Sequence, residues 1–208
     1  MDNQESIIKL LKEVGAIVNG HFVYASGKHG EIYINKDAIY LYPQKLYWLC
    51  LLIAGHFSSV DVDVVVGPVL GGIPLSQWVA YHLSEINGRG GKEALAVYAE
   101  KTEDKNGFIF NRGYDKVIAG KRVLIVEDII TTGNSARKVI KATHSAGGIV
   151  IGLGALVNRG GAKINDFCGI SNFFSLVDLK LNSWDESDCP LCLKRVPIDN
   201  KIGHGRAL

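Results

Sequence analysis

Short, unbroken apolar runs recur between residues 62 and 177, and segments with helical spacing separate several of them. The runs show little polar alternation, which is typical of strands that are buried on both faces of a parallel sheet. Alternation of such strands with helices predicts an α/β fold, with a central, mostly parallel sheet and helices on both faces. The expected strands are residues 62–66, 94–98, 122–126, 148–157 and 173–177, and the expected helices between them are 74–83 and 134–146.

The first part of the chain predicts separate elements. Residues 5–14 carry apolar side chains at helical spacing, residues 21–35 alternate around a Ser-Gly turn as in a β-hairpin, and residues 43–56 resemble a buried helix. Residues 101–120 hold charges and three glycines between two strands. A long segment of this kind is often a functional lid, and an exposed ribbon without a function is the alternative. The tail after residue 182 has no clear period.

Composition limits the classes of partner. The 208 residues suit one domain, and the formal net charge of +2 gives no basic surface for nucleic acid. The longest apolar runs, 48–55 and 147–157, are much shorter than the roughly 20 residues of a membrane span. The N-terminus has no signal-peptide core, and four cysteines do not indicate a disulfide scaffold. We therefore expect a cytoplasmic protein with no nucleic-acid or membrane partner.

The strongest chemical signal is the segment 123–135, which reads VLIVEDIITTGNS. Its apolar run delivers Glu127 and Asp128 to the carboxyl end of a strand, where open α/β sheets bind ligands. The loop that follows opens a helix, and backbone N–H groups at a helix N-terminus bind anions. The carboxylates can accept hydrogen bonds from sugar hydroxyls or bind hydrated Mg²⁺, and the N–H groups that follow can donate hydrogen bonds to a phosphate. Together they fit a ribose 5′-phosphate. An ordinary capped helix would explain Thr132 or Ser135 but not the acidic pair.

This segment resembles the phosphoribosyl-pyrophosphate (PRPP) motif of the type I phosphoribosyltransferases. The rival nucleotide motifs, G-x-x-x-x-G-K-[ST] and G-x-G-x-x-G after the first strand, are missing from the sequence. The resemblance implies a type I phosphoribosyltransferase fold with a small N-terminal hood and a flexible lid. It also implies a set of PRPP-binding residues, namely Leu70, Gly71, Gly72, Lys101, Glu127, Asp128, Ile129, Ile130, Thr131, Thr132, Gly133, Asn134 and Ser135.

Other segments resemble the orotate-specific branch of that family, in chain order. Residues 24–35, YASGKHGEIYIN, are similar to its N-terminal signature, and residues 66–74, VGPVLGGIP, to its pyrophosphate loop. Residues 99–101 resemble a strand end that carries a PRPP-binding lysine. Residues 157–161, VNRGG, resemble the segment whose arginine holds the orotate carboxylate, and the CPLC tail at 189–192 resembles a prokaryotic subgroup.

The resemblance implies the transfer of a phosphoribosyl group from PRPP to orotate, in pyrimidine nucleotide synthesis. Mg²⁺ is then the cofactor, carried by PRPP near Glu127 and Asp128, and a homodimer is the expected assembly. Lys101 and Asp128 are the expected catalytic residues. The implied orotate-binding residues are Tyr33, Ile34, Thr131 and Arg159. One domain is expected, with a base-side segment at 1–60, a PRPP-binding core at 61–180 and a tail at 181–208.

Each of these sites also has a plainer interpretation from the residues alone. Gly71 and Gly72 let a backbone approach pyrophosphate, or simply form a tight strand-to-helix turn. Lys101 meets the expected lid, where its ammonium reaches a phosphate or is solvated. Arg159 follows an apolar strand, and its planar fork suits a carboxylate or a structural salt bridge. Tyr33 and Ile34 contact the base or belong to the core alternation.

Several positions depart from the orotate branch. Ala25 stands where many of these enzymes have Lys or Arg, residues 30–31 are Gly-Glu where Ser-Pro is usual, and Gly71 replaces a lysine. At the lid positions where one branch of the family has a lysine and a histidine, this chain has Asp104 and Asn106. Lys105 or Arg112 are the nearby residues that could replace them. These departures leave two alternatives, a purine phosphoribosyltransferase and a non-catalytic PRPP-binding regulator. Thr131 argues against the first, because purine enzymes carry an aspartate there.

Cys189 and Cys192 form a C-x-x-C pair that offers half of a zinc site. Cys50, Cys168 or His204 would have to supply the remaining ligands, because the sequence has no second C-x-x-C. A redox role needs a thioredoxin-like context, which is missing. Packed thiols without a metal are the favoured interpretation.

Overall fold

The computed structural model describes residues 4–24, 26–88 and 91–200, and the chain divides into two compact units. One unit is Pro43–Leu179, and the other combines the segments Met1–Tyr42 and Lys180–Leu208. The sequence placed the change from base-side segment to core at residue 60. That functional boundary stays a prediction. The compact units divide at Pro43, because the helix that begins there packs against the next helix and the sheet of the larger unit.

The larger unit is built on a six-stranded sheet, in the order β5-β4-β3-β6-β7-β8. All neighbours pair in parallel except β4 and β5, so the predicted α/β fold with a mostly parallel sheet is confirmed. The strands are β3 (Val64–Pro68), β4 (Leu95–Lys101), β5 (Phe108–Ile109), β6 (Arg122–Ile130), β7 (Ile149–Asn158) and β8 (Phe173–Asp178).

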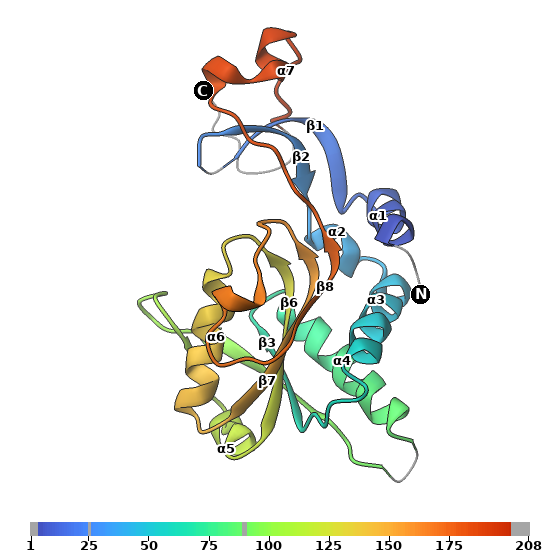
Figure 1. The fold of residues 1–208 in the computed structure, drawn as a ribbon, viewed down its shortest axis with the longest axis vertical. Helices are drawn as coiled ribbons and strands as arrows, with labels where there is room; N and C mark the ends of the chain where they lie inside the picture. Colours follow the sequence, from blue (N-terminus) through green and yellow to red (C-terminus); the bar gives the residue numbers. More distant parts are fainter. Residues whose placement is uncertain (1–3, 25, 89–90, 201–208) are drawn as a thin grey trace. The chain divides into compact units, whose positions relative to one another are not determined.

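Helices cover both faces of this sheet (Figure 1). The helices α3 (Pro43–His56) and α4 (Gly72–Ile86) lie on one face, and α5 (Tyr114–Ile118) and α6 (Asn134–Ser145) lie on the other. A short 3-10 helix, η1 (Ile164–Asp166), precedes β8. Every residue of β3 is buried, which is the reason for its unbroken apolar sequence. On the α6 face, Val139 and Ile140 pack with Val64, Ile125 and Leu153 of the strands.

Strand β6 is longer than its apolar run predicts. Its parallel pairing with β7 continues through Glu127, opposite Ala155, to Ile130, opposite Asn158. The acidic pair therefore lies inside the strand and not after it. The loop that follows begins at the carboxyl end of the sheet, where parallel strands place their ligands.

The expected lid is mostly anchored. Strand β5 forms an antiparallel hairpin with the end of β4, and α5 follows it. Phe110 and Ile118 are buried in the core, so the segment 101–120 is not an exposed lid along its whole length. Residues 102–107 form the exposed turn between the two strands.

The smaller unit contains α1 (Gln4–Glu13), β1 (Ile17–Val23), β2 (His29–Ile34) and α2 (Asp37–Tyr40) from the N-terminal segment. Strands β1 and β2 form the predicted antiparallel hairpin. The C-terminal segment adds η2 (Glu186–Asp188) and α7 (Pro190–Leu193), and Trp184 pairs with His29 of β2. Among the described residues, no helix combines the length and the apolar character that crossing a membrane requires.

Candidate active site

The loop between β6 and α6 forms a pocket of about 130 Å³. Eight of the predicted PRPP-binding residues line it, and Ala136 completes the lining: Glu127, Ile129, Ile130, Thr131, Thr132, Gly133, Asn134 and Ser135. This volume has room for a group of the size of a phosphate. A second pocket of about 640 Å³, between β5 and α6, is lined by none of the predicted site residues.

Gly133 allows this loop to turn directly into α6. Its φ of +72° lies in the left-handed region that favours glycine, and it is the N-cap residue of the helix. A β-carbon on Gly133 would lie 2.8 Å from a ring carbon of Phe167, so the position has no room for a side chain. Residues 134–136 in the first turn of α6 line the pocket, and the backbone N–H groups at a helix N-terminus suit an anion.

Arg137 stabilises the loop, although it lies outside the residues predicted from the motif. Its guanidinium donates hydrogen bonds to the Thr132 carbonyl oxygen at 2.8 Å and to the Asn134 side-chain oxygen at 2.6 Å. A third, longer bond reaches the Asp166 carbonyl oxygen at 3.4 Å. In the sequence, the signal that could have pointed to Arg137 is its position on the first turn of the helix that follows the motif. Arg137 thus holds both sides of the turn around Gly133.

Glu127 and Asp128 are both buried, with 6% of each residue exposed. The side-chain oxygen of Asp128 accepts a hydrogen bond from the Ile129 N–H at 2.6 Å, which fixes the carboxylate against its own strand. Glu127 lines the phosphate-sized pocket. Asp128 is not among the residues that line this pocket. A carboxylate in the pocket wall suits the hydroxyls of a ribose, and carboxylate oxygens are also the hard ligands that Mg²⁺ prefers.

In the loop between β3 and α4, the backbones of Gly67 and Gly72 pack closely against each other. A β-carbon on Gly67 would lie 1.9 Å from the Gly72 carbonyl oxygen, and one on Gly72 would lie 2.7 Å from the Gly67 carbonyl carbon. Gly72 is thus required for the strand-to-helix turn, whatever it binds. The Val69–Leu70 peptide bond is cis, and the Val69 N–H donates to the Ala99 carbonyl oxygen at 2.9 Å. Leu70 is 79% exposed.

Lys101 is the last residue of β4, opposite Phe108, and its side chain is exposed. The adjacent turn is held by Asp104, which accepts hydrogen bonds from the Thr102 hydroxyl and from the Asn106 N–H. These bonds lower the pKa of Asp104. Arg112 is paired with Glu100 at 3.2 Å. The structure therefore gives Asp104 and Arg112 roles in shaping the hairpin.

Arg159 follows β7, next to the start of the phosphate loop. The N–H groups of Arg159 and Gly160 both donate to the Ile130 carbonyl oxygen, at 2.8 and 3.2 Å. The buried Asn158 side chain donates to Asp178 at 2.8 Å and to the Ala162 carbonyl oxygen at 3.0 Å. Asn158 is a second supporting residue that lies outside the predicted set. It fixes the turn that presents Arg159 at the same sheet edge as the pocket.

Tyr33 and Ile34 belong to the smaller unit. As successive residues of β2 they point to opposite faces of the hairpin, and Ile34 is buried while Tyr33 is half-buried beside Phe22. The departure at Gly30 has a local reason. A β-carbon there would lie 2.1 Å from the hydroxyl oxygen of Tyr24, whose hydroxyl donates to the Ile32 carbonyl oxygen at 2.6 Å. Ala25, another departure, lies outside the described residues.

Comparison with known proteins agrees with this geometry. The phosphoribosyl transferase domain matches residues 52–188, which is well over half of the chain. The orotate phosphoribosyltransferase of Caldanaerobacter subterraneus is 35% identical over 195 residues, which cover 94% of this chain and 95% of the relative.

Solved structures show the same fold. The orotate phosphoribosyltransferase of Mycobacterium tuberculosis superposes with a TM-score of 0.66 at 23% identity, over 85% of this chain and 96% of the other. The adenine phosphoribosyltransferase of Rhodothermus marinus gives a TM-score of 0.60 at 20% identity, over 84% and 99%. The fold alone therefore does not select the base. The chain belongs to the phosphoribosyltransferase family, and its curated relatives at 30–35% identity include orotate phosphoribosyltransferases.

Proposed function

We propose that this protein transfers the phosphoribosyl group of PRPP to orotate and releases orotidine 5′-monophosphate and pyrophosphate, a step of pyrimidine nucleotide synthesis. The main support is the pocket at the start of α6, because eight residues expected to bind PRPP line it together. Relatives at 30–35% identity over most of the chain support orotate as the base.

The 5′-phosphate of PRPP binds in this pocket, against the N–H groups and hydroxyls of residues 131–135. Glu127 and Asp128 accept hydrogen bonds from the ribose hydroxyls. Both are buried within β6, close to its carboxyl end, so they hold the sugar in one orientation. Lys101 and the loop at Gly71 and Gly72 meet the pyrophosphate.

The bond from ribose C1 to the pyrophosphate oxygen breaks as the bond from C1 to an orotate ring nitrogen forms. Positive charge develops on the ribose ring in this transition state, and fixed carboxylates stabilise it electrostatically. The orotate ring nitrogen is already acidic, so the site needs no strong general base. Thr131 at the position of the purine enzymes' aspartate agrees with this.

The buried acidic pair fits a magnesium ion that arrives with PRPP, because carboxylate and substrate oxygens are its preferred ligands. The ion would neutralise charge on the departing pyrophosphate. Glu127 and Asp128 would hold it on the ribose side through oxygen contacts.

Arg159 binds the orotate carboxylate with its planar guanidinium. Its turn is fixed to Ile130 and by Asn158, so the charge is presented beside the ribose end of the pocket. The exposed turn at 102–107 covers the bound substrates and excludes water. A homodimer remains a prediction from the family resemblance, and a cytoplasmic location remains a prediction from the composition and the N-terminal sequence.

A panel of bases tests the proposal. Pyrophosphate release is measured with PRPP and Mg²⁺ and, in separate reactions, orotate, adenine, hypoxanthine, guanine or xanthine. We expect release with orotate and none above background with the purines. Release with a purine and not with orotate would assign the protein to the purine branch. Tight PRPP binding without turnover of any base would instead indicate a regulator.

A further inference from the structure

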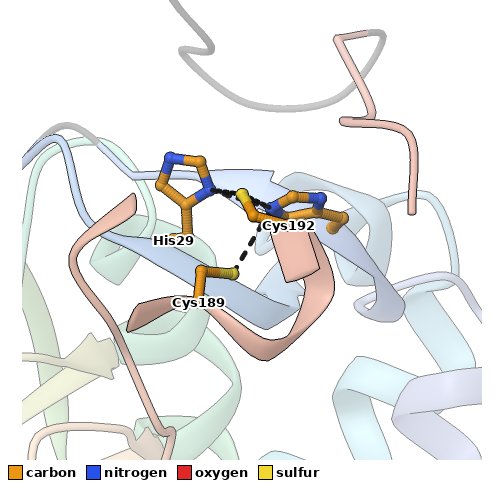
Figure 2. A group of neighbouring side chains, drawn as sticks. His29, Cys189 and Cys192 are labelled. Carbon is orange, nitrogen blue, oxygen red and sulfur yellow. Dashed lines mark hydrogen bonds between the residues drawn. The ribbon is translucent and has the colours of Figure 1, made fainter. Parts of the chain in front are cut away.

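Four metal-binding side chains converge in the smaller unit, whereas every residue assigned to PRPP belongs to the larger unit. They are His21 of β1, His29 of β2, and Cys189 and Cys192 at the start of α7. Their ligand atoms all lie within 4.8 Å of one another. Figure 2 shows His29, Cys189 and Cys192 pointing towards one centre. The two histidines are 2% and 3% exposed, and Cys189 is fully buried.

The distances between these atoms fit a tetrahedral ion. Zinc lies roughly 2.0–2.1 Å from nitrogen and roughly 2.3 Å from sulfur, which puts neighbouring ligand atoms about 3.3–3.8 Å apart. Each sulfur lies 3.7 Å from Nε2 of His21, and the Cys192 sulfur lies 3.3 Å from Nδ1 of His29. The two histidine nitrogens are 2.8 Å apart and would have to separate slightly around an ion.

The groups behind the cluster prepare it for a cation. Nδ1 of His21 lies 2.7 Å from the Val196 carbonyl oxygen, to which it donates, so that Nε2 faces the cluster as a lone-pair donor. Metal-binding histidines in proteins are held in this way. His29 is fixed by its backbone, which exchanges hydrogen bonds with Trp184 at 2.8 and 2.9 Å.

The cluster joins two segments that are far apart in the sequence, so an ion bound there would stabilise the fold of the smaller unit. His21 and Cys189 are 168 residues apart in the sequence, so an ion that joins them closes a very long loop. The smaller unit has only about 70 residues from two distant segments, and units of this size often need a metal or disulfide. The surface ion pair of Lys28 and Asp185 links the same segments, but exposed pairs contribute little.

We propose that His21, His29, Cys189 and Cys192 bind a structural Zn²⁺ ion that fixes the C-terminal segment to the N-terminal hairpin. Two thiolates with two imidazoles are a common zinc set, and four protein ligands leave no open position for chemistry. The sequence had offered Cys50, Cys168 or His204 as partners of the C-x-x-C pair. Cys50 and Cys168 belong to the larger unit, and His204 lies outside the described residues.

Metal analysis of the purified full-length protein tests the site. We expect about one zinc ion per chain, as for other closed four-ligand sites. The double change Cys189→Ser with Cys192→Ser should abolish zinc binding. Cys168→Ser, which removes an exposed thiol of the larger unit, is the matched control and should retain it. Equal loss of zinc in both variants would contradict the assignment.

A second measurement needs no variant. Titration of the unmodified protein with an organomercurial should release the zinc to a chromogenic chelator as the thiols react. After exchange with Co²⁺, the protein should show the ligand-field bands of a tetrahedral site and a thiolate-to-cobalt charge-transfer band. Zinc removal should also lower the melting temperature and expose the C-terminal segment to protease.

The proposal is overturned if the isolated protein contains no more zinc than the double cysteine variant and shows no tetrahedral Co²⁺ spectrum. A disulfide between Cys189 and Cys192 in the isolated protein would overturn it as well. None of these readouts depends on turnover, so the zinc site and the orotate reaction can fail independently.

Discussion

The α-carbon of Gly160 packs so tightly against Thr131 that a β-carbon on Gly160 would lie 1.5 Å from the Thr131 carbonyl oxygen. Thr131 opens the loop that forms the phosphate-sized pocket, and Gly160 follows the arginine assigned to orotate. The two substrate-binding segments are therefore in direct backbone contact. A change at Gly160 must move one of them.

Gly160→Ala should accordingly impair both substrates. Inserting a methyl group into tight packing costs about 1–3 kcal/mol, and about 1.4 kcal/mol corresponds to a tenfold change in binding. We expect the KM values for PRPP and for orotate to rise roughly tenfold. Steady-state kinetics with each substrate varied in turn measures both.

Gly55→Ala is the matched control, because a β-carbon on this helical glycine meets nothing within 4 Å. It should leave the kinetics unchanged and stabilise α3 by up to about 1 kcal/mol. Unchanged KM values in Gly160→Ala would show that the contact has no role in binding.

The extent of the sheet shows what a local pattern can predict. Apolar runs without polar alternation identified β3, β4, β6, β7 and β8. Burial on both faces is the reason for β3, all of whose residues are buried, whereas β4 has only Val97 and Ala99 buried. The same criterion ended β6 at Val126, because a carboxylate normally marks the end of a buried strand. Pairing with β7 keeps Glu127 and Asp128 in the strand, and the sequence of β6 alone does not contain that pairing.

The remaining differences come from contacts between distant segments. The sequence predicted the pocket residues from one continuous motif. It did not identify Asn158, whose function depends on Asp178, or the two histidines beside the C-x-x-C pair. His21 and Cys189 are 168 residues apart, and no periodicity in either segment reports their proximity.

Arg137 supplies a second prediction, because it supports the phosphate loop without lining the pocket. Arg137→Ala removes the bonds to the Thr132 carbonyl and the Asn134 side chain and should loosen the turn around Gly133. Hydrogen bonds from a charged donor contribute about 1.5–3 kcal/mol, so we expect the KM for PRPP to rise at least tenfold. The KM for orotate should change little.

Lys138→Ala removes the same charge from the next position of α6, which is also exposed. It should leave the KM for PRPP within about twofold of the unmodified protein, because surface charges contribute little. Equal effects of the two changes would mean that only the net charge of α6 matters, and that Arg137 does not position the loop.

Arg159 leads to a third prediction. Arg159→Ala should raise the KM for orotate by roughly 10- to 100-fold, since a bidentate carboxylate bond is among the stronger hydrogen-bonded pairs. PRPP binding, measured separately by calorimetry, should be nearly unchanged. Arg159→Lys keeps the charge without the planar fork and should recover only part of the loss. An unchanged KM for orotate in Arg159→Ala would remove this residue from the orotate site.

The acid stability of the larger unit depends on a group at the other end of the sheet. Asp63 precedes β3, and its carboxylate accepts hydrogen bonds from the Arg122 N–H at 2.7 Å and from the Arg122 guanidinium at 3.2 Å. Lys92 pairs with the same carboxylate. Burial raises the pKa of Asp63, but these partners outweigh it and lower the pKa to about 2.

An ordinary aspartate in the unfolded chain has a pKa of about 3.9, so Asp63 binds its proton less readily when folded. Its contribution to stability is therefore complete above about pH 4 and disappears as the pH falls to about 2. Asp63→Asn should destabilise the protein at neutral pH, and its difference from the unmodified protein should shrink through that window. Urea unfolding midpoints at several pH values measure this. Asp61→Asn, at a side chain that is 55% exposed, should have a smaller effect that added salt reduces further. A difference between Asp63→Asn and the unmodified protein that stays constant down to about pH 2 would show that this carboxylate is not held ionised by Arg122 and Lys92.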